Sequence, residues 1–485
     1  MMRCIEYIIL GIALTLLNLQ NGWSQADTVW MTTQGGLGSD QWNEVVLCHN
    51  GDLLVAGTTS SDLVNGNEVY LARLDSLHHC IWTRTLGAFG VEMGHDVIED
   101  SVGNIWCLAT VNGANTDAYD ILLLRFDEDG VMMDQLLFEN EGIQFGQKLA
   151  FDGHHQLAIT GVEVNAAGGR DALYYLMNTE TLALQYFSVP SDNQNLEITV
   201  TEYDSTQAQW LIVGNALMDD SVYQVVGWGV DTFGNIVWEH VNDPLSDSLR
   251  VFDAVWKNNY WVLAGCDWVG GNWRAQIVKW TPGQSIEKMG SFALTGAETL
   301  FHSVVHRSTG NGFVFGGWTY DMGAGLSDAY VHAFDDDFNW DGGAIFGGSK
   351  EDKIYALVND IHGKLHWVGM NGSYNAQMQM QGWVARLNAG FVQSSNIHTQ
   401  IENDDCFDLS VEHSTADESL QLNYSCGMMK FSAVMDKIEV FDVQGKRMSV
   451  AEGTDHLNVH FSSGYYLIQW RMGSRRGIQK FVFLD

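Results

Sequence analysis

The stretch Leu54-Val55-Ala56-Gly57 decides the fold, because the chain repeats this short apolar run with its small last residue. The pattern recurs six more times, with last residues 51 to 53 positions apart. The later copies are Trp106–Ala109, Ala158–Gly161, Leu211–Gly214, Val262–Gly265, Phe313–Gly316 and His366–Gly369. A fixed period of this size indicates supersecondary units that are stacked or arranged radially.

A second sequence feature recurs with the same period. A later apolar run closes on an Asp or Asn in six of the units, and the fifth unit has Thr281 instead. These residues are Asp75, Asp127, Asn178, Asp231, Asp335 and Asn388. Asp and Asn nucleate turns through their own side chains. We therefore predict that these residues form turns rather than bind a metal.

Each unit also contains four short strand candidates. In the first unit they span residues 43–48, 53–58, 69–74 and 81–86. The repeat region shows no sustained period of 3.6 apolar residues, so helices should be scarce. Four antiparallel strands in about fifty residues are typical of a β-propeller blade. The sequence thus predicts an all-β, seven-bladed β-propeller.

The N-terminal strand is expected to complete the ring. Residues 29–33 resemble the fourth strand of a blade although no blade precedes them, and the seventh unit has three clear strands. We predict that this N-terminal strand supplies the missing fourth strand of the last blade. Such closure leaves no unpaired edge between the first and last blades.

Composition and charge narrow the class of protein. The chain has 485 residues and a formal net charge of −36, which argues against nucleic acid or an anionic membrane as partner. Residues 1–26 have the pattern of a secretory signal peptide, with Arg3 before a short apolar core and small residues near Ala26. We expect no transmembrane segment in the mature chain. Six cysteines would remain after signal removal, and a disulfide between Cys406 and Cys426 is left open.

The period stops after residue 393. Residues 394–405 form a predicted polar linker, and residues 406–485 a separate strand-rich unit that we interpret as a small β-sandwich. The propeller is therefore predicted to span residues 27–393.

A resemblance becomes specific in this last unit. Its segments at residues 438–446, 456–468 and 477–483 are similar to the central strand and turn, the glycine-plus-aromatic strand and the closing strand of type A sorting domains of the type IX secretion system. The sequence departs from that family at residues 413–416, where His-Ser-Thr-Ala stands in place of the usual Pro-Asn-Pro turn. The resemblance implies export across the outer membrane, with the secretion machinery as partner. It also implies removal of this domain, and a location at the cell surface or outside the cell.

Catalytic motifs are missing from the propeller region. The sequence contains no G-x-S-x-G, no H-E-x-x-H, no glycine-rich phosphate loop and no C-x-x-C. The segment Asp335–Gly342 comes nearest to a calcium loop, but Trp340 replaces the sharp-turn glycine and Phe346 the twelfth ligand. We therefore predict no catalytic residue, no metal site and no cofactor.

Binding residues are easier to propose. The loops between second and third strands and the blade-to-blade links emerge on one face, and in this sequence they carry aromatic residues beside Asn and Asp. Such side chains suit sugar rings or a protein surface. The predicted ligand-binding residues are Trp42, Trp268, Trp273, Trp318, Tyr320 and Tyr374.

Two functions follow from these features. The first is an exported, non-catalytic binding or adhesion propeller for a glycan or protein ligand, displayed or released through its sorting domain. The second is a propeller enzyme, such as a calcium- and quinone-dependent dehydrogenase or a glycan-degrading enzyme. A perturbed carboxylate pair or an ordered calcium ion in the central tunnel would favour the enzyme, and an apolar, filled tunnel would favour binding.

Overall fold

The computed structural model describes residues 28–35, 38–61, 66–87, 90–112, 119–138, 142–190, 195–218, 222–241, 248–292, 298–308, 311–320, 326–373, 380–387, 398–401, 422–425, 428–442, 447–458, 464–472 and 475–483. These residues form strands and turns without a helix, which confirms the all-β prediction. None of them builds a helix long and apolar enough to cross a membrane. The predicted signal peptide, residues 1–26, lies outside the described residues.

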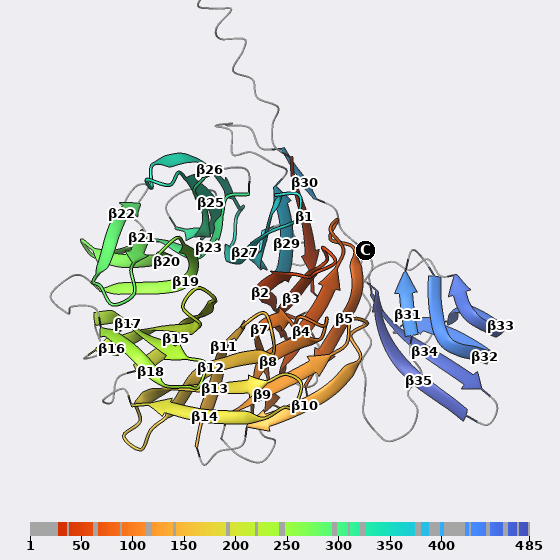
Figure 1. The fold of residues 1–485 in the computed structure, drawn as a ribbon. Helices are drawn as coiled ribbons and strands as arrows, with labels where there is room; N and C mark the ends of the chain where they lie inside the picture. The colour runs from red at the N-terminus through yellow and green to blue at the C-terminus, as the bar shows by residue number, and fades with distance from the viewer. Residues whose placement is uncertain are drawn as a thin grey trace, which may run out of the picture.

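The repeats fold into consecutive sets of antiparallel strands arranged like blades around a common centre (Figure 1). One parallel pair, Arg170 with Asn195, joins the third and fourth sets into a single sheet. The first set is β2 (Asp40–Leu47), β3 (Leu53–Thr59), β4 (Gly66–Leu74) and β5 (Cys80–Leu86), with the short β6 (Gly90–Val91) beside β4. The second is β7 (Met93–Glu99), β8 (Ile105–Asn112), β9 (Tyr119–Phe126) and β10 (Met132–Phe138). The third is β11 (Gln144–Phe151), β12 (Gln156–Val164), β13 (Arg170–Asn178) and β14 (Leu184–Val189).

The remaining sets follow the same order. They are β15 (Asn195–Asp204), β16 (Gln209–Met218), β17 (Val222–Asp231) and β18 (Ile236–Val241), then β19 (Leu249–Lys257), β20 (Tyr260–Val269), β21 (Asn272–Trp280) and β22 (Ile286–Phe292). Next come β23 (Thr299–His306), β24 (Phe313–Thr319), β25 (Asp328–Phe334) and β26 (Trp340–Phe346). The last repeat contributes β27 (Asp352–Asn359), β28 (Leu365–Asn371) and β29 (Gln381–Leu387).

The N-terminal strand completes the last sheet, as the sequence predicted. Strand β1 (Thr28–Gln34) pairs antiparallel with β29, with Val29 opposite Leu387 and Gln34 opposite Gly382. Strand β30 (His398–Ile401) then pairs in parallel with the other edge of β1. Part of the stretch predicted as linker is thus a strand on the edge of the closing sheet.

The first strands of the sets form the inner ring. Strands β2, β7, β11, β15, β19, β23 and β27 contact one another in this order, and β27 contacts β2 again. The core lies between neighbouring sheets. One cluster joins Trp42, Tyr70 and Val55 of the first set to Ala356 and Val384 of the last. Each large apolar side chain buried in this way contributes about 1.5 to 3 kcal/mol to folding.

Every first strand carries a β-bulge at the same place. The register shifts between Trp42 and Glu44 in β2, and at the equivalent step in the other six strands. The extra residues are Asn43, His95, Gln147, Thr199, Phe252, His302 and Tyr355. A bulge bends its strand and redirects the neighbouring side chains. This device brings polar residues to the centre of the ring.

The repeated acidic residues form turns. The Asp231 carboxylate accepts the backbone N–H groups of Phe233 and Asn235, and Asp335 does the same for Asp337 and Asn339. The side-chain amide of Asn339 also donates to Asp335, and this bond, followed by the backbone bonds, lowers the pKa of Asp335. The turn interpretation is therefore confirmed at both positions.

The described part of residues 406–485 is a separate sheet. It contains β31 (Leu422–Ser425), β32 (Met428–Asp442), β34 (Gly464–Met472) and β35 (Arg475–Phe483) in this order, and β33 (Arg447–Asn458) pairs with β32. Cys406 and Cys426 lie outside the described residues. The β-sandwich and the sorting domain therefore stay predictions.

Candidate functional site

Trp42 is a core residue, which corrects its assignment to the ligand-binding set. Its side chain is 0% exposed and stacks on Tyr70, with ring centroids 4.2 Å apart and planes 16° from parallel. The residue lies directly before the bulge of β2, where its ring faces the interface with the last sheet. A side chain buried in this way presents no surface to a ligand.

Four other predicted residues lie on the face where the first strands begin, which we call the entry face. Trp268 and Tyr320 are each 41% exposed, and Trp273 and Trp318 are half-buried. The backbone N–H of Trp268 donates to Ser248 and that of Tyr320 to Glu298, so both aromatic residues sit beside the start of a first strand. Tyr374 lies outside the described residues.

The entry face carries a connected series of rings and an arginine, which we call the aromatic band. It consists of Trp268, Trp273, Tyr223, Arg250, Phe252, His302, Trp318 and Tyr355. Ring centroids are 5.4 Å apart for Trp268–Trp273, 5.9 Å for Trp273–Tyr223, 5.1 Å for Phe252–His302, 5.2 Å for His302–Trp318 and 5.6 Å for Trp318–Tyr355. Arg250 lies over Tyr223 and Phe252, at 4.7 and 5.0 Å from their centroids. The band thus runs from the β20–β21 hairpin to bulge residues of the inner ring.

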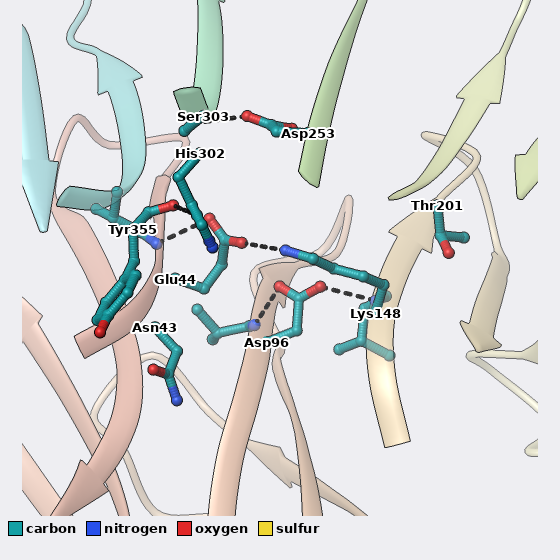
Figure 2. A network of polar contacts seen from close by, with 12 residues as sticks. Asn43, Glu44, Asp96, Lys148, Thr201, Asp253, His302, Ser303 and Tyr355 are labelled. Atoms are coloured by element: carbon teal, nitrogen blue, oxygen red, sulfur yellow. Dashed lines mark hydrogen bonds and ion pairs between the residues drawn. The ribbon is translucent and has the colours of Figure 1, made fainter. Parts of the chain in front are cut away.

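The centre of the ring holds a polar cluster (Figure 2). Lys148 of β11 donates to Glu44 of β2 over 2.7 Å, although β7 stands between these strands in the ring. Asp96, Glu202 and Asp253 add three more carboxyl groups to the electrostatic environment of Lys148. We call these five residues the central cluster.

Two carboxylates of the central cluster also tie neighbouring strands together. Asp96 accepts the backbone N–H of Leu149 over 2.8 Å, and Asp253 accepts that of Val304 over 2.8 Å. Ser303 donates to Asp253 over 2.6 Å. Each Asp therefore links its own first strand to the next one. Asp96 and Asp253 therefore help to hold neighbouring strands of the inner ring together.

Burial and like charges perturb the central carboxyl groups. Burial, with Asp253 nearby, raises the pKa of Glu202 to about 8. Burial likewise raises the pKa of Asp96 to about 7 and that of Asp253 to about 6, while Lys148 opposes both shifts. Burial opposes the charge of Lys148, but Glu44, Asp96 and Asp253 outweigh it and raise the pKa of that lysine. The cluster therefore holds protons near neutral pH.

The centre is partly accessible to solvent. The side chain of Lys148 is 27% exposed and that of Glu44 17%, although both belong to strands of the inner ring. The centre is thus polar and hydrated rather than apolar and filled. Perturbed carboxyl groups were expected to favour an enzyme, and an apolar, filled tunnel to favour a binding protein. The centre contains the perturbed carboxyl groups.

Sequence reasoning missed the central cluster and His302. The signal was present, since Glu44, Asp96, Lys148, Asp253 and Ser303 recur at the period of the repeat. The bulges were not visible in the sequence, and without them the residues that face the centre could not be told from those between sheets. Among the described residues, no group of three or more His, Cys, Asp or Glu side chains is arranged to hold a metal ion.

The fold and the site define an all-β propeller with an aromatic entry face and a charged, hydrated centre. No protein-family model and no curated protein matches the sequence. Among solved structures, the chain is similar to a fungal alcohol oxidase of the AA5 family in complex with copper, at 10% identity and a TM-score of 0.44 over 94% of this chain and 98% of that one.

Three other solved structures are similar to a comparable extent. The β-propeller domain of the Trilobed protease from Pyrococcus furiosus matches at 10% identity and a TM-score of 0.38, over 80% of this chain and 96% of that one. A Pyrococcus horikoshii acylaminoacyl peptidase matches at 10% identity and 0.38, and the alignment spans only 57% of its length. A neuraminidase-like protein from A/bat/Guatemala/164/2009 matches at 9% and 0.41, over 62% and 89% of the two chains. Similarities this weak carry no information on activity.

Proposed function

We propose that this protein is a non-catalytic binding propeller that takes a glycan or protein ligand on its entry face. The observation that carries the proposal is the aromatic band, which joins side chains from four neighbouring sheets into one surface. Trp268, a member of the band, and Tyr320, on the same face, are exposed aromatic side chains. Aromatic rings next to fixed polar groups provide apolar contact together with orientation.

We further propose that the chain reaches the cell surface or the medium through its C-terminal unit. The support is the similarity of residues 438–446, 456–468 and 477–483 to type A sorting domains of the type IX secretion system. The predicted signal peptide at residues 1–26 is consistent with a first step across the inner membrane. The secretion machinery is thus one proposed partner, and the ligand of the entry face is the other.

A propeller enzyme is the second candidate. The raised pKa values of Glu202, Asp96 and Asp253 in a hydrated centre are what general acid–base catalysis uses. Asp96 and Asp253 hold neighbouring strands through their carboxylates, however, which gives their placement a structural purpose. For this reason we rank binding above catalysis.

The test compares the full chain with a variant that lacks the outer aromatic pair, Trp268→Ala with Trp273→Ala. Both are titrated with oligosaccharides and with peptides, and binding is followed calorimetrically. We expect the double variant to lose at least tenfold in affinity for the ligand that the parent binds. Trp340→Ala is the matched control, because Trp340 is 52% exposed on the outer strand β26 and away from the band. Equal loss in the control, or turnover of a probe that Glu202→Gln abolishes, would overturn the binding proposal.

A further inference from the structure

His302 has one ring nitrogen whose role the structure fixes. Its Nδ1 lies 2.7 Å from the backbone carbonyl oxygen of Tyr355. A carbonyl oxygen only accepts, so Nδ1 carries the hydrogen and Nε2 carries the lone pair in the neutral ring. Among the described residues, Nε2 makes no hydrogen bond. His302 therefore offers an acceptor of known identity within the aromatic band.

The ring is held rigidly in this orientation. Phe252 stacks on it at 5.1 Å between centroids and 13° between planes. Trp318 packs at 5.2 Å and Tyr355 at 5.3 Å. These three contacts come from three different strands, β19, β24 and β27. Because its neighbours fix the ring, a ligand group would meet a preorganised acceptor.

Several other bulge residues use their polar side-chain atoms in hydrogen bonds within the protein. Asn43 donates to the carbonyl oxygen of Gly94, the Gln147 side chain accepts from the backbone of Ile198, and the Tyr355 hydroxyl donates to the sulfur of Met370. These side chains tie the ring together. His302 makes one such tie and keeps its second nitrogen available.

Two cationic side chains pack against the rings that hold this acceptor. Arg250 lies over Phe252 and donates through one terminal nitrogen to Glu197 at 3.0 Å, while its Nε is buried without a partner. Lys353 lies over the Trp318 ring at 5.5 Å and pairs with Glu351. A ligand group that meets both an acceptor and donors must itself donate and accept. A hydroxyl does this, whereas an apolar peptide side chain does not.

We propose that the inner end of the aromatic band is a carbohydrate site in which Nε2 of His302 accepts a hydrogen bond from a sugar hydroxyl. In this site the half-buried Trp318 provides apolar area for the C–H face of the sugar ring, and Arg250 supplies donors to ring oxygens. The inference rests on the proposed binding function and names its ligand class.

The test uses the full chain with four probes: cellotetraose, an N-acetylglucosamine trimer, a galacturonate trimer and an aromatic tetrapeptide. His302→Phe keeps an aromatic ring and removes the acceptor, and His302→Asn restores an acceptor oxygen. We expect at least one sugar to bind the parent, His302→Phe to weaken that binding tenfold or more, and His302→Asn to recover part of it. Melting temperatures of all variants are measured, so that loss of folding is not read as loss of binding.

Outcomes that overturn the inference are distinct from those that overturn the proposed function. A sugar that binds His302→Phe as well as the parent, and is weakened by Trp268→Ala with Trp273→Ala, leaves the proposed function standing and removes the role of His302. Binding of the peptide without any sugar removes the carbohydrate assignment alone. No binding by any of the four probes removes both the carbohydrate site and the support for the entry face.

A pH comparison gives a readout that does not depend on a variant. Burial, together with the positive charges of Lys148 and Arg250, lowers the pKa of His302 to about 4, against the opposing hydrogen bond to Tyr355. The ring therefore stays neutral at pH 5.5, where an ordinary histidine is mostly protonated. Sugar affinity is expected to be equal at pH 7.5 and 5.5. A fall of tenfold over this range would contradict acceptance by a neutral His302.

Discussion

Two polar regions of the propeller place titratable side chains inside the molecule, and they differ in their access to water. At the junction of the first and last sheets, which we call the closure seam, Asp360 accepts from Nε2 of His366 over 3.3 Å, and Nδ1 of His366 accepts from His78 over 2.8 Å. His78 and His366 are 1% and 0% exposed. In the central cluster, by contrast, Lys148 keeps 27% of its side chain accessible. The seam is a buried chain of hydrogen bonds, and the centre is a partly accessible group of four carboxyl groups around one lysine.

This difference separates structure from function. A dry chain of hydrogen bonds serves closure, and any broken link leaves a buried group without a partner. A hydrated cluster tolerates changes in charge because water and protons can compensate. The two regions should therefore respond differently to substitution and to pH.

The largest effect is expected from His366→Leu. This change removes the partner of the His78 ring nitrogen and of Oδ2 of Asp360 in the interior, at a cost of about 3 kcal/mol. Chemical denaturation at pH 7.5 measures the free energy of unfolding. His362→Ala, at an exposed turn beside the same strand, is the control and should cost less than about 0.5 kcal/mol. An equally small cost for His366→Leu would show that the hydrogen bonds of the closure seam do not stabilise the junction of the first and last sheets.

Lys148→Met should come second. It leaves Glu44 and Asp96 without their shared cation, and water screens part of the resulting repulsion, so we expect a loss of about 2 kcal/mol at pH 8. At pH 6 the loss should be smaller, because Asp96 has a pKa raised to about 7 and takes up a proton. Denaturation at both pH values measures it, with Lys279→Met in the exposed pair with Glu287 as the control. A loss that is the same at both pH values would argue against proton uptake by the cluster.

The pH dependence of the seam is the third expectation. Burial lowers the pKa of His366 to about 4 and that of His78 well below its usual value. Between pH 6.5 and 4 the unfolded chain binds protons that the folded seam does not, so stability falls as the pH falls through this window. For His366 the loss from pH 7.5 to 5 is about 2 kcal/mol. Subtracting the pH profile of His366→Leu from that of the parent isolates this contribution, and a flat difference would contradict it.

Glu202→Gln should act in the opposite direction. The folded pKa of Glu202 is raised to about 8, so the folded protein binds a proton between pH 4.5 and 8 that the unfolded chain has released. This group therefore stabilises the fold less as the pH rises. Replacing it with Gln should therefore raise the free energy of unfolding at pH 8, and by much less at pH 5. A gain that persists at pH 5 would show that charge is not the cause.

The architecture was predictable because the repeat carries it. The repeat period, the turns at acidic residues such as Asp231 and the extra N-terminal strand could each be inferred from a local pattern. The pairing of β1 with β29 confirmed the prediction for residues 29–33. The aromatic face was partly predictable, since Trp268 and Tyr320 lie at strand ends that are exposed.

The centre was harder to predict for a physical reason. Glu44 and Lys148 are distant in sequence and meet only because two bulges turn them inward across the ring. Trp42 shows the converse error, because one residue of register separates a side chain at the bulge from one buried between sheets. A prediction from loop position alone does not resolve that single step.

The order in which the chain emerges has a consequence for when the ring can close. Thr32 of β1 hydrogen-bonds to Val384, 352 residues later. The first strand can therefore pair only after nearly the whole propeller has been synthesised. Contacts of such long sequence separation form slowly, since the intervening chain must be in place first. Until then the edge of β29 is a template for a strand from another molecule. We therefore expect the ring to close late in folding, and β30, which follows β29 in the chain, then covers the outer edge of β1.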